Sequence, residues 1–330
     1  VVVYEGNYTG FEVSVSGNSS SPITFKALGN AVINKSGATG DGVRIQNASY
    51  IKIEGFKIEN PLQRCIAARG ATADMPMRGI VIQNNVCGNA GWEGFYLSQT
   101  TGAMVFNNTI SGSGLLRIER NHGIYLANAG SDNSVIKGNT ISGSKGTGSE
   151  GIHINGDLSV GGDGLIKNVI IENNFILNNA ANGISLDGVQ DSLIQNNVIY
   201  KNGRHALRAY RGDGAFGPKN LKAVNNTFIA GVSGWAVKIS EDLGGHTIFN
   251  NILLSQGSGS ISLNNSSFIS NKNILSNKFS LNNELSILDL ISWQKSGYDL
   301  NSFISAESDL FTDSLNSDYS LKDVSKAVNA

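Results

Sequence analysis

Residues 169–199 read VIIENNFILNNAANGISLDGVQDSLIQNNVI, and the order of the runs in this stretch decides the fold. A short apolar run comes first, then an Asn pair, a second apolar run and, after a turn, a third run led by Gly. The series then begins again. Each run is shorter than a typical helix and has the composition of a strand. The stretch predicts one coil of three short strands, followed by the start of a similar coil.

The Asn element recurs through most of the chain. Its members are Asn85, Asn108, Asn139, Asn174, Asn197, Asn226 and Asn251, at steps of 23, 31, 35, 23, 29 and 25 residues. Strands of constant length joined by variable loops produce this scatter, whereas propeller blades and helical repeats keep a tighter period. Asn tolerates left-handed backbone and pairs well with its own kind, so we expect an Asn ladder at one turn of successive coils.

The pattern Gly-[Ile/Val/Phe]-x-[Leu/Ile], followed by an apolar pair and Asn-Asn, resembles the pectate-lyase-like β-helix superfamily over roughly residues 1–270. Residues 4–8 and 22–27 resemble the first coil of bacterial members, and residues 292–294 resemble their tail. The resemblance implies an all-β fold: a single-stranded right-handed parallel β-helix with three parallel sheets, about ten coils and a C-terminal capping segment. It does not fix the reaction, because this fold hosts lyases, hydrolases, epimerases, phage tailspikes and non-enzymes.

The two ends of such a solenoid need caps, because open strand edges invite aggregation. We expect residues 1–270 to form the β-helix. Residues 271–330 are expected to form a loop, a short helix and a closing segment packed on the last coils. Helical spacing at 285–291 marks the helix, and Trp293 just after it is interpreted as packing.

The net charge of −1 creates no field toward nucleic acid or an anionic membrane, so we expect neither as a partner. No apolar run is long enough to span a bilayer, and the chain opens directly in a strand-like run without a visible signal peptide. The resemblance implies a protein that is secreted, periplasmic or on the cell surface, and we expect a monomer. Cys65 and Cys87 fall in one repeat and are interpreted as a buried free pair, with a disulfide as the alternative.

The third strand of each coil carries the functional face in this interpretation. Like positions in successive coils stack about 4.8 Å apart. One outward column runs Arg44, Ala67, Tyr96, Tyr125, His153, Ser185, Arg208 and Lys238, and the next runs Gln46, Arg69, Ser98, Ala127, Asn155, Asp187, Tyr210 and Ser240. The position before the Gly runs Asp41, Arg64, Glu93, His122, Glu150, Asn182, His205 and Trp235. A merely solvated face would not gather three of the four His residues beside stacked Tyr.

Two long insertions, 156–164 and 211–218, follow this strand two coils apart. Long loops on a rigid scaffold commonly carry function, so we expect them to wall a groove over His153, Asp187 and Arg208. The groove would bind a polysaccharide or oligosaccharide, since the apolar faces of sugar rings pack on aromatic rings. The alternative is that the stacked Tyr side chains simply cover the sheet. The predicted substrate-binding residues are Tyr96, Tyr125, His122, Glu150, His205, Arg211, Asp213 and Asn155.

The first mechanism considered is β-elimination on a uronate-containing polysaccharide. It needs a group that neutralises the carboxylate, a base for the C5 proton and an acid for the leaving oxygen. Arg208 is the candidate neutraliser, His153 or Lys238 the base, and Tyr125 or His122 the acid. The predicted catalytic residues are His153, Asp187, Arg208, Lys238 and Asp157.

Other chemistries stay open at this point. Calcium is a possible cofactor, held by Asp157, Asp163 and Asp187 in Gly-rich loops, and no other cofactor is implied. Glycoside hydrolysis needs two carboxylates, for which these three residues, Asp213 and Glu150 are candidates. Any of the Asp residues can instead cap its own turn. The non-enzymatic alternative is a module that holds glycan without cutting it.

Overall fold

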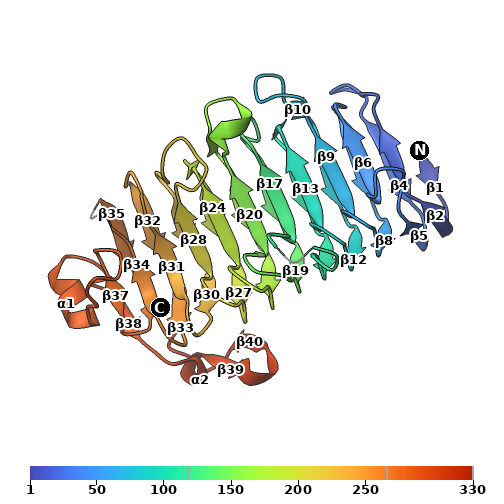
Figure 1. The fold of residues 1–330 in the computed structure, drawn as a ribbon. Helices are drawn as coiled ribbons and strands as arrows, with labels where there is room; N and C mark the ends of the chain where they lie inside the picture. The colour runs from blue at the N-terminus through green and yellow to red at the C-terminus, as the bar shows by residue number, and fades with distance from the viewer. Residues whose placement is uncertain (118, 265–266, 329–330) are drawn as a thin grey trace.

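The computed structural model describes residues 1–117, 119–264 and 267–328. The chain winds into a solenoid in which each coil gives one strand to each of three long sheets (Figure 1). Every pairing between neighbouring strands of these sheets is parallel, as in Ile152 beside Ile184. The parallel β-helix predicted from the sequence is thereby confirmed.

The three sheets are built in coil order. Sheet 1 contains β1 (Val2–Val3), β4 (Ile23–Ala27), β7 (Ile51–Glu54), β11 (Val81–Gln83), β15 (Met104–Phe106), β18 (Val135–Lys137), β22 (Ile170–Glu172), β26 (Leu193–Gln195), β29 (Lys222–Val224), β32 (His246–Phe249) and β35 (Phe268–Asn271). Sheet 2 contains β2 (Gly6–Thr9), β5 (Ala31–Lys35), β8 (Lys57–Glu59), β12 (Val86–Gly88), β16 (Thr109–Ser111), β19 (Thr140–Ser142), β23 (Phe175–Leu177), β27 (Val198–Tyr200), β30 (Thr227–Ala230), β33 (Ile252–Ser255), β36 (Ile274–Leu275) and β38 (Phe303–Ile304). Sheet 3 contains β3 (Phe11–Val13), β6 (Val43–Gln46), β9 (Ile66–Arg69), β13 (Phe95–Ser98), β17 (Ile124–Ala127), β20 (Ile152–Asn155), β24 (Ile184–Asp187), β28 (Leu207–Tyr210), β31 (Trp235–Ile239), β34 (Gly259–Ser262) and β37 (Phe279–Ser280).

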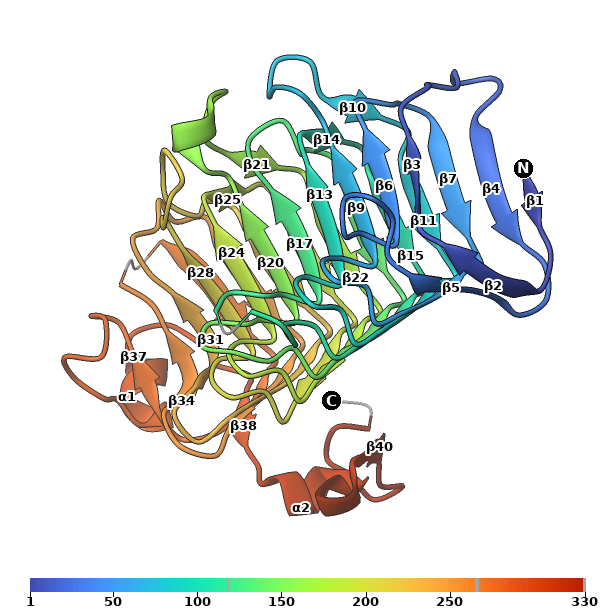
Figure 2. The same ribbon diagram turned by 45° about the vertical axis from the view of Figure 1, so that its right-hand side comes forward.

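Smaller elements decorate the turns. They are the parallel pairs β10 (Met77–Arg78) with β14 (Thr100–Thr101) and β21 (Ile166–Lys167) with β25 (Val189–Gln190), the antiparallel pair β39 (Phe311–Asp313) with β40 (Asp318–Leu321), and the short helices η1 (Leu158–Val160), α1 (Leu290–Lys295), α2 (Glu307–Leu310) and η2 (Ser314–Asn316). The loops that carry β10 and η1 project from the same edge of the solenoid (Figure 2). None of the described helices has the length and apolar character that crossing a bilayer requires.

Alternation along each strand separates the core from the outer faces. In β20, Ile152 and Ile154 are fully buried, while His153 and Asn155 point outward. Because β17 and β20 pair without a shift in register, Ile152 stacks on Ile124 of the preceding coil. One continuous apolar core results, and any outward side chain lies beside its counterparts in adjacent coils. Register therefore positions the functional residues.

The Asn ladder is present and buried. Asn174 donates to Asn197 Oδ1 from both its backbone N–H and its side-chain amide, each at 3.0 Å. The same pattern links Asn85, Asn108, Asn139, Asn174, Asn197, Asn226, Asn251 and Asn273. The preceding Asn173 and Asn196 adopt φ of 56° and 54°, which Asn tolerates better than most residues. The ladder satisfies backbone groups at every turn and leaves no Asn of this column for chemistry.

The two cysteines differ from the expectation. Cys65 and Cys87 form a disulfide with Cα atoms 5.8 Å apart, so the interpretation as a buried free pair was wrong. They belong to successive coils rather than to one repeat: Cys65 directly precedes β9, and Cys87 lies inward on β12 of the next coil. Both side chains point into the core, where stacking of adjacent coils brings them within bonding distance.

The C-terminal residues close the last coils. Trp293 of α1 is fully buried and stacks on Phe279, with ring centroids 4.8 Å apart, as its interpretation as packing requires. Helix α1 begins at Leu290, where Asp289 caps it, later than the apolar spacing over 285–291 suggests. Strands of sheets 2 and 3 continue beyond residue 270, as far as β38, so a domain division at that residue stays a prediction.

Candidate functional site

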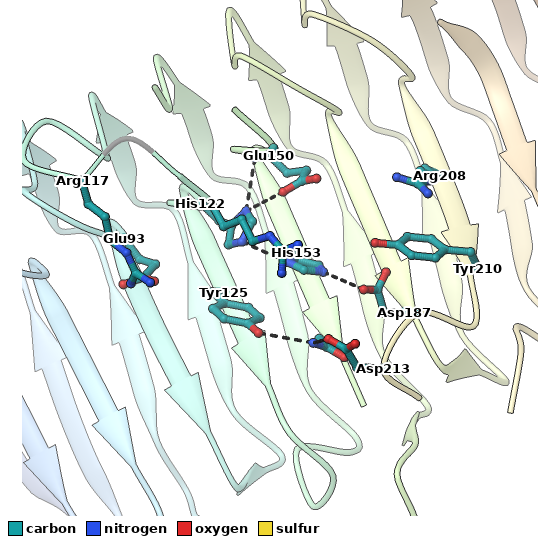
Figure 3. Close-up of a pocket in the computed structure, with 14 residues that line it drawn as sticks. Glu93, Arg117, His122, Tyr125, Glu150, His153, Asp187, Arg208, Tyr210 and Asp213 are labelled. Carbon is teal, nitrogen blue, oxygen red and sulfur yellow. Dashed lines mark hydrogen bonds and ion pairs between the residues drawn. The ribbon is translucent and has the colours of Figure 1, made fainter. Parts of the chain in front are cut away.

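A cavity of about 450 Å³ opens on the outer face of sheet 3, in the middle of the solenoid (Figure 3). Its floor comes from strands β17, β20, β24 and β28. The residues that line it are Glu93, Arg117, Arg120, His122, Tyr125, Gly148, Glu150, His153, Asn155, Asp187, Arg208, Tyr210, Gly212 and Asp213. The face predicted to carry function thus contains a polar cavity at the predicted columns.

Register places the cavity-lining side chains of one column side by side. Tyr125, His153, Ser185 and Arg208 stand beside one another in successive strands. Ser185 is fully buried between them and does not line the cavity, whereas Tyr125, His153 and Arg208 of the same column do.

Four side chains lie in one series of close polar contacts across the cavity floor (Figure 3), in which His122 Nδ1 also accepts a hydrogen bond from the Glu150 backbone N–H at 3.2 Å. Glu150 Oε2 lies 2.6 Å from His122 Nδ1, and His122 Nε2 lies 3.0 Å from His153 Nδ1. His153 Nε2 then lies 3.2 Å from Asp187 Oδ2. Glu150 and His122 enter from the turns that precede β20 and β17, and the other two come from β20 and β24. The chain Glu150–His122–His153–Asp187 is called the proton chain below.

The electrostatics of the proton chain assign its shared proton. Burial, together with the charge of His153, lowers the pKa of His122. Burial also opposes a charge on His153, but the hydrogen bond to Asp187 and the charges of Asp187 and Glu150 outweigh it and raise the pKa of His153. Burial works against the Glu150 carboxylate too, yet its hydrogen bond with His122 and the charges of the histidines hold its pKa below the usual range. Of the two histidines, His153 is thus the one whose surroundings favour the protonated form.

Tyr125 lies face to face with His153. Their ring centroids are 5.0 Å apart and the planes differ by 9°. Burial raises the pKa of Tyr125, so its hydroxyl stays protonated at neutral pH. The hydroxyl accepts a weak hydrogen bond from Asn155 Nδ2 at 3.4 Å, which leaves its own proton available. The stacked pair places the Tyr125 hydroxyl, a proton donor, beside the His153 imidazole, a base whose pKa depends on its neighbours.

Two carboxylates and one guanidinium occupy the other end of the cavity. Asp187 Oδ1 is buried and makes no hydrogen bond of ordinary geometry with the described residues. Burial and the charge of Asp187 raise the pKa of Tyr210, whose ring lies 3.9 Å from the guanidinium carbon of Arg208. Asp213 accepts a hydrogen bond from Asn155 Nδ2 at 3.3 Å. This end offers an anchored Arg and two carboxylates.

The walls of the cavity differ from those expected. Only Gly212 and Asp213 of the loop 211–218 reach it, and no residue of 156–164 lines it. These two loops bond to each other instead, with Leu158 N donating to Asp213 O at 2.9 Å.

The opposite wall comes from turns that lead from sheet 2 into sheet 3. Arg117, Arg120 and Gly148 lie in these turns, and sequence reasoning did not include them among the site residues. The available signal was the 31-residue step between Asn108 and Asn139, which contains the two arginines, and the 35-residue step from Asn139 to Asn174, which contains Gly148, since both mark expanded coils.

Several predicted residues lie away from the cavity. Lys238 forms an ion pair with Glu284, and His205 is buried with Nδ1 accepting from Trp235 N at 2.9 Å. Burial and the positive charges of Lys238, Arg204 and Arg208 lower the pKa of His205 to about 3. Two further residues, Arg211 and Tyr96, do not line the cavity, although Tyr96 contacts Tyr125 edge-on at 5.5 Å.

The three Asp residues predicted to hold calcium do not form a common ligand group in the structure. Asp157 caps η1, and Asp163 pairs with Lys167 at 2.7 Å. Within the described residues, His122, Glu150 and His153 are the group whose candidate ligand atoms all lie within 4.8 Å. Two imidazoles and a carboxylate are donors that suit transition metals better than calcium. The calcium site stays a prediction.

Comparisons with known proteins agree with the fold. The model of the right handed beta helix region matches residues 93–279, and the model of a periplasmic copper-binding protein (NosD) matches residues 5–159. No curated protein matches the chain by sequence.

Three solved structures illustrate the likeness. An alginate lyase from Paenibacillus sp. str. FPU-7 is 22% identical, with 81% of this chain and 91% of that chain covered and a TM-score of 0.60. The pectate lyase Pel9A is 12% identical, with 98% and 81% covered and a TM-score of 0.55. The surface adhesin PfbA of Streptococcus pneumoniae is 14% identical, with 82% and 76% covered and a TM-score of 0.61.

Identities this low show a shared fold alone. The likeness confirms the resemblance to pectate-lyase-like proteins and the right-handed winding. Because the first family model covers more than half of the 330 residues, the chain belongs to the right-handed β-helix family.

Proposed function

We propose that this protein cleaves an acidic, uronate-containing polysaccharide by β-elimination in the cavity on sheet 3. The observation that supports this most directly is the stacked pair of His153 and Tyr125 at the cavity floor. It combines a base of tunable pKa with a protonated phenol, which are the two proton-transfer groups that the reaction requires.

The proposed step breaks the C5–H and C4–O4 bonds of one uronate and forms a C4=C5 double bond. Neutral His153 takes the C5 proton, and Tyr125 gives its phenolic proton to the leaving O4 oxygen. Arg208 pairs with the uronate carboxylate and so makes the C5 proton more acidic. After product release, the proton passes from His153 to Tyr125 through solvent, and both residues return to their starting states.

The proton chain supports this choice of base. Its contact between His153 Nε2 and Asp187 is long, at 3.2 Å, and a substrate can replace it. Lys238 is the weaker candidate because its ammonium is held by Glu284 outside the cavity. His122 is the weaker acid because it is buried and its Nδ1 faces Glu150.

A second function has one specific observation in its favour. Asp187 and Asp213 line the same cavity, and one buried oxygen of Asp187 makes no ordinary hydrogen bond. A pair of carboxylates is what glycoside hydrolysis needs. Structures similar to this chain also include an adhesin, so glycan binding without cleavage is the third outcome to be distinguished.

We further propose that the protein acts as a monomer outside the cytoplasm, at the cell surface, in the periplasm or after secretion. The Cys65–Cys87 disulfide is typical of oxidising compartments. One of the matching family models describes a periplasmic protein.

The test is a screen of the purified protein against pectate, alginate, glycosaminoglycans and neutral glucans and xylans, with calcium and with chelator. We expect new absorbance from unsaturated uronates with an acidic polysaccharide. Reducing ends without that absorbance would move the assignment to hydrolysis at Asp187 and Asp213. Binding to a glycan with neither signal would leave a module that holds sugar without cutting it.

A further inference from the structure

An arginine cluster lies on sheet 3 toward the N-terminus from the cavity. Two of its members have acidic partners. Arg64 Nε lies 2.8 Å from Glu93, and Arg44 lies 3.7 Å from Asp41. The charges of these two guanidinium groups are therefore compensated within the protein.

The third member, Arg69, has no such partner. Its Nε is buried without a hydrogen bond, and its guanidinium makes no ion pair with the described residues. Burial and the positive charges of Arg64 and Arg44 lower the pKa of Arg69. A partly buried cation beside two like charges is costly unless an anion joins it. The Asp41 carboxylate attracts Arg69 from beyond ion-pair distance and already pairs with Arg44 and Arg64, so the anion that contacts Arg69 directly is expected to come from a ligand.

The position of Arg69 connects it to the cavity. It ends β9, and β9, β13 and β17 are consecutive strands, so Arg69 lies two coils from Tyr125, or about 10 Å along the solenoid. Tyr96 bridges this interval: its ring lies 5.0 Å from the Arg69 guanidinium carbon and 5.5 Å from the Tyr125 ring. A sugar chain that reacts at Tyr125 and runs past Tyr96 toward the N-terminal coils would reach Arg69 with another of its units.

We propose that Arg69 binds an anionic group, a carboxylate or a sulfate, on a unit of the substrate chain that is separate from the unit cleaved at His153 and Tyr125. This inference rests on the proposed function and narrows it. The preferred substrate carries charges on several nearby units, and the protein binds it along the outer face of sheet 3 rather than only at the scissile bond.

The variants that test this are Arg69→Gln, Arg69→Lys and the matched control Arg44→Gln, which removes an arginine that already has acidic partners. Binding is measured by calorimetry in a Tyr125→Phe background, with oligouronates from disaccharide to hexasaccharide, sulfated oligosaccharides and neutral oligomers of the same lengths. Steady-state kinetics on the otherwise unaltered protein run in parallel, and thermal unfolding confirms that each variant folds.

We expect Arg69→Gln to weaken binding of the long acidic oligomers about tenfold, the loss of one charge-assisted hydrogen bond. Disaccharide binding should not change, and KM should rise with kcat unchanged. Arg69→Lys should recover part of the loss, because it restores the charge without the planar fork. A stronger effect with carboxylated than with sulfated oligomers, or the reverse, identifies the anion.

Equal weakening of short and long oligomers, an equal effect on neutral oligomers, or the same loss in Arg44→Gln would overturn the assignment. The outcome is separable from that of the proposed function. Arg69-dependent binding of long acidic oligomers without any unsaturated product would reject β-elimination and retain the anion site. Unsaturated product without Arg69-dependent binding would retain β-elimination and reject the anion site.

Discussion

Two buried aspartates of this protein, Asp299 and Asp187, meet opposite surroundings. Asp299 is fully buried, and four side chains donate hydrogen bonds to its carboxylate: Trp293, Ser270, Asn273 and Ser302. It closes the end of the Asn ladder and anchors α1. Asp187 is 3% exposed, contacts His153 with one oxygen and leaves the other without an ordinary hydrogen bond.

The difference shows how a buried carboxylate that stabilises the fold can be told apart from one that takes part in a functional site. A buried carboxylate whose lone pairs are all satisfied is held in one state and stabilises the fold. A buried carboxylate with one oxygen left unsatisfied at a cavity carries a cost that a functional role or a ligand can offset. Changes at the C-terminal cluster should therefore affect stability, and changes at the cavity should affect reaction and pH dependence.

The largest expected effect is on the proposed reaction. His153→Ala or Tyr125→Phe should lower kcat by about 10²–10⁴-fold, the usual contribution of a positioned proton-transfer group, with little change in thermal unfolding. Tyr200→Phe is the matched control, because Tyr200 lies on sheet 2 against Tyr319. Activity within a few-fold of the unaltered protein in both cavity variants would remove these residues from the mechanism.

The next effect is on stability. Asp299→Ala should lower the free energy of unfolding by about 3–5 kcal/mol, because it leaves four buried donors without an acceptor. Denaturant titration of this variant and of Asp187→Ala tests the comparison directly. We expect a much smaller loss for Asp187→Ala, and similar losses in the two variants would show that both carboxylates are structural.

The buried His205 should make stability depend on pH. Its pKa is about 3 in the folded protein, well below the usual 6.5. As the pH falls from 6.5 toward 3, His205 binds a proton in the unfolded chain but stays neutral in the folded protein. The free energy of unfolding should therefore fall by about 1.4 kcal/mol per pH unit from this group. His205→Gln should have a shallower slope over that range, and an unchanged slope would contradict the assignment.

The smallest effect is a shift in the pH profile of activity. The charge of Asp187 helps to raise the pKa of His153, and the proposed base acts only when neutral. Asp187→Asn should therefore move the acid limb of kcat/KM to lower pH. If the acid limb does not move, Asp187 does not tune the pKa of the base. If Asp187→Asn abolishes cleavage, and the unaltered protein produces reducing ends without unsaturated product, hydrolysis is favoured instead.

Much of this arrangement follows from short-range patterns in the sequence. Alternating apolar residues and a recurring Asn predicted the coils, the ladder and the alignment of Tyr125, His153 and Arg208. These predictions succeed because parallel strands in register repeat the same environment at every coil, so the position of a residue within its own repeat determines its neighbours.

Features that depend on turns or on contacts between different elements were decided only by the tertiary structure. Loop lengths do not reveal where Arg117 and Arg120 point, and spacing does not show that Cys65 meets Cys87 of the adjacent coil. The pairing of Lys238 with Glu284 and the order of the proton chain depend on side-chain orientation. Periodicity in the sequence determined which side chains share a column. Packing in three dimensions decided which of them lie close enough to form a hydrogen bond or an ion pair.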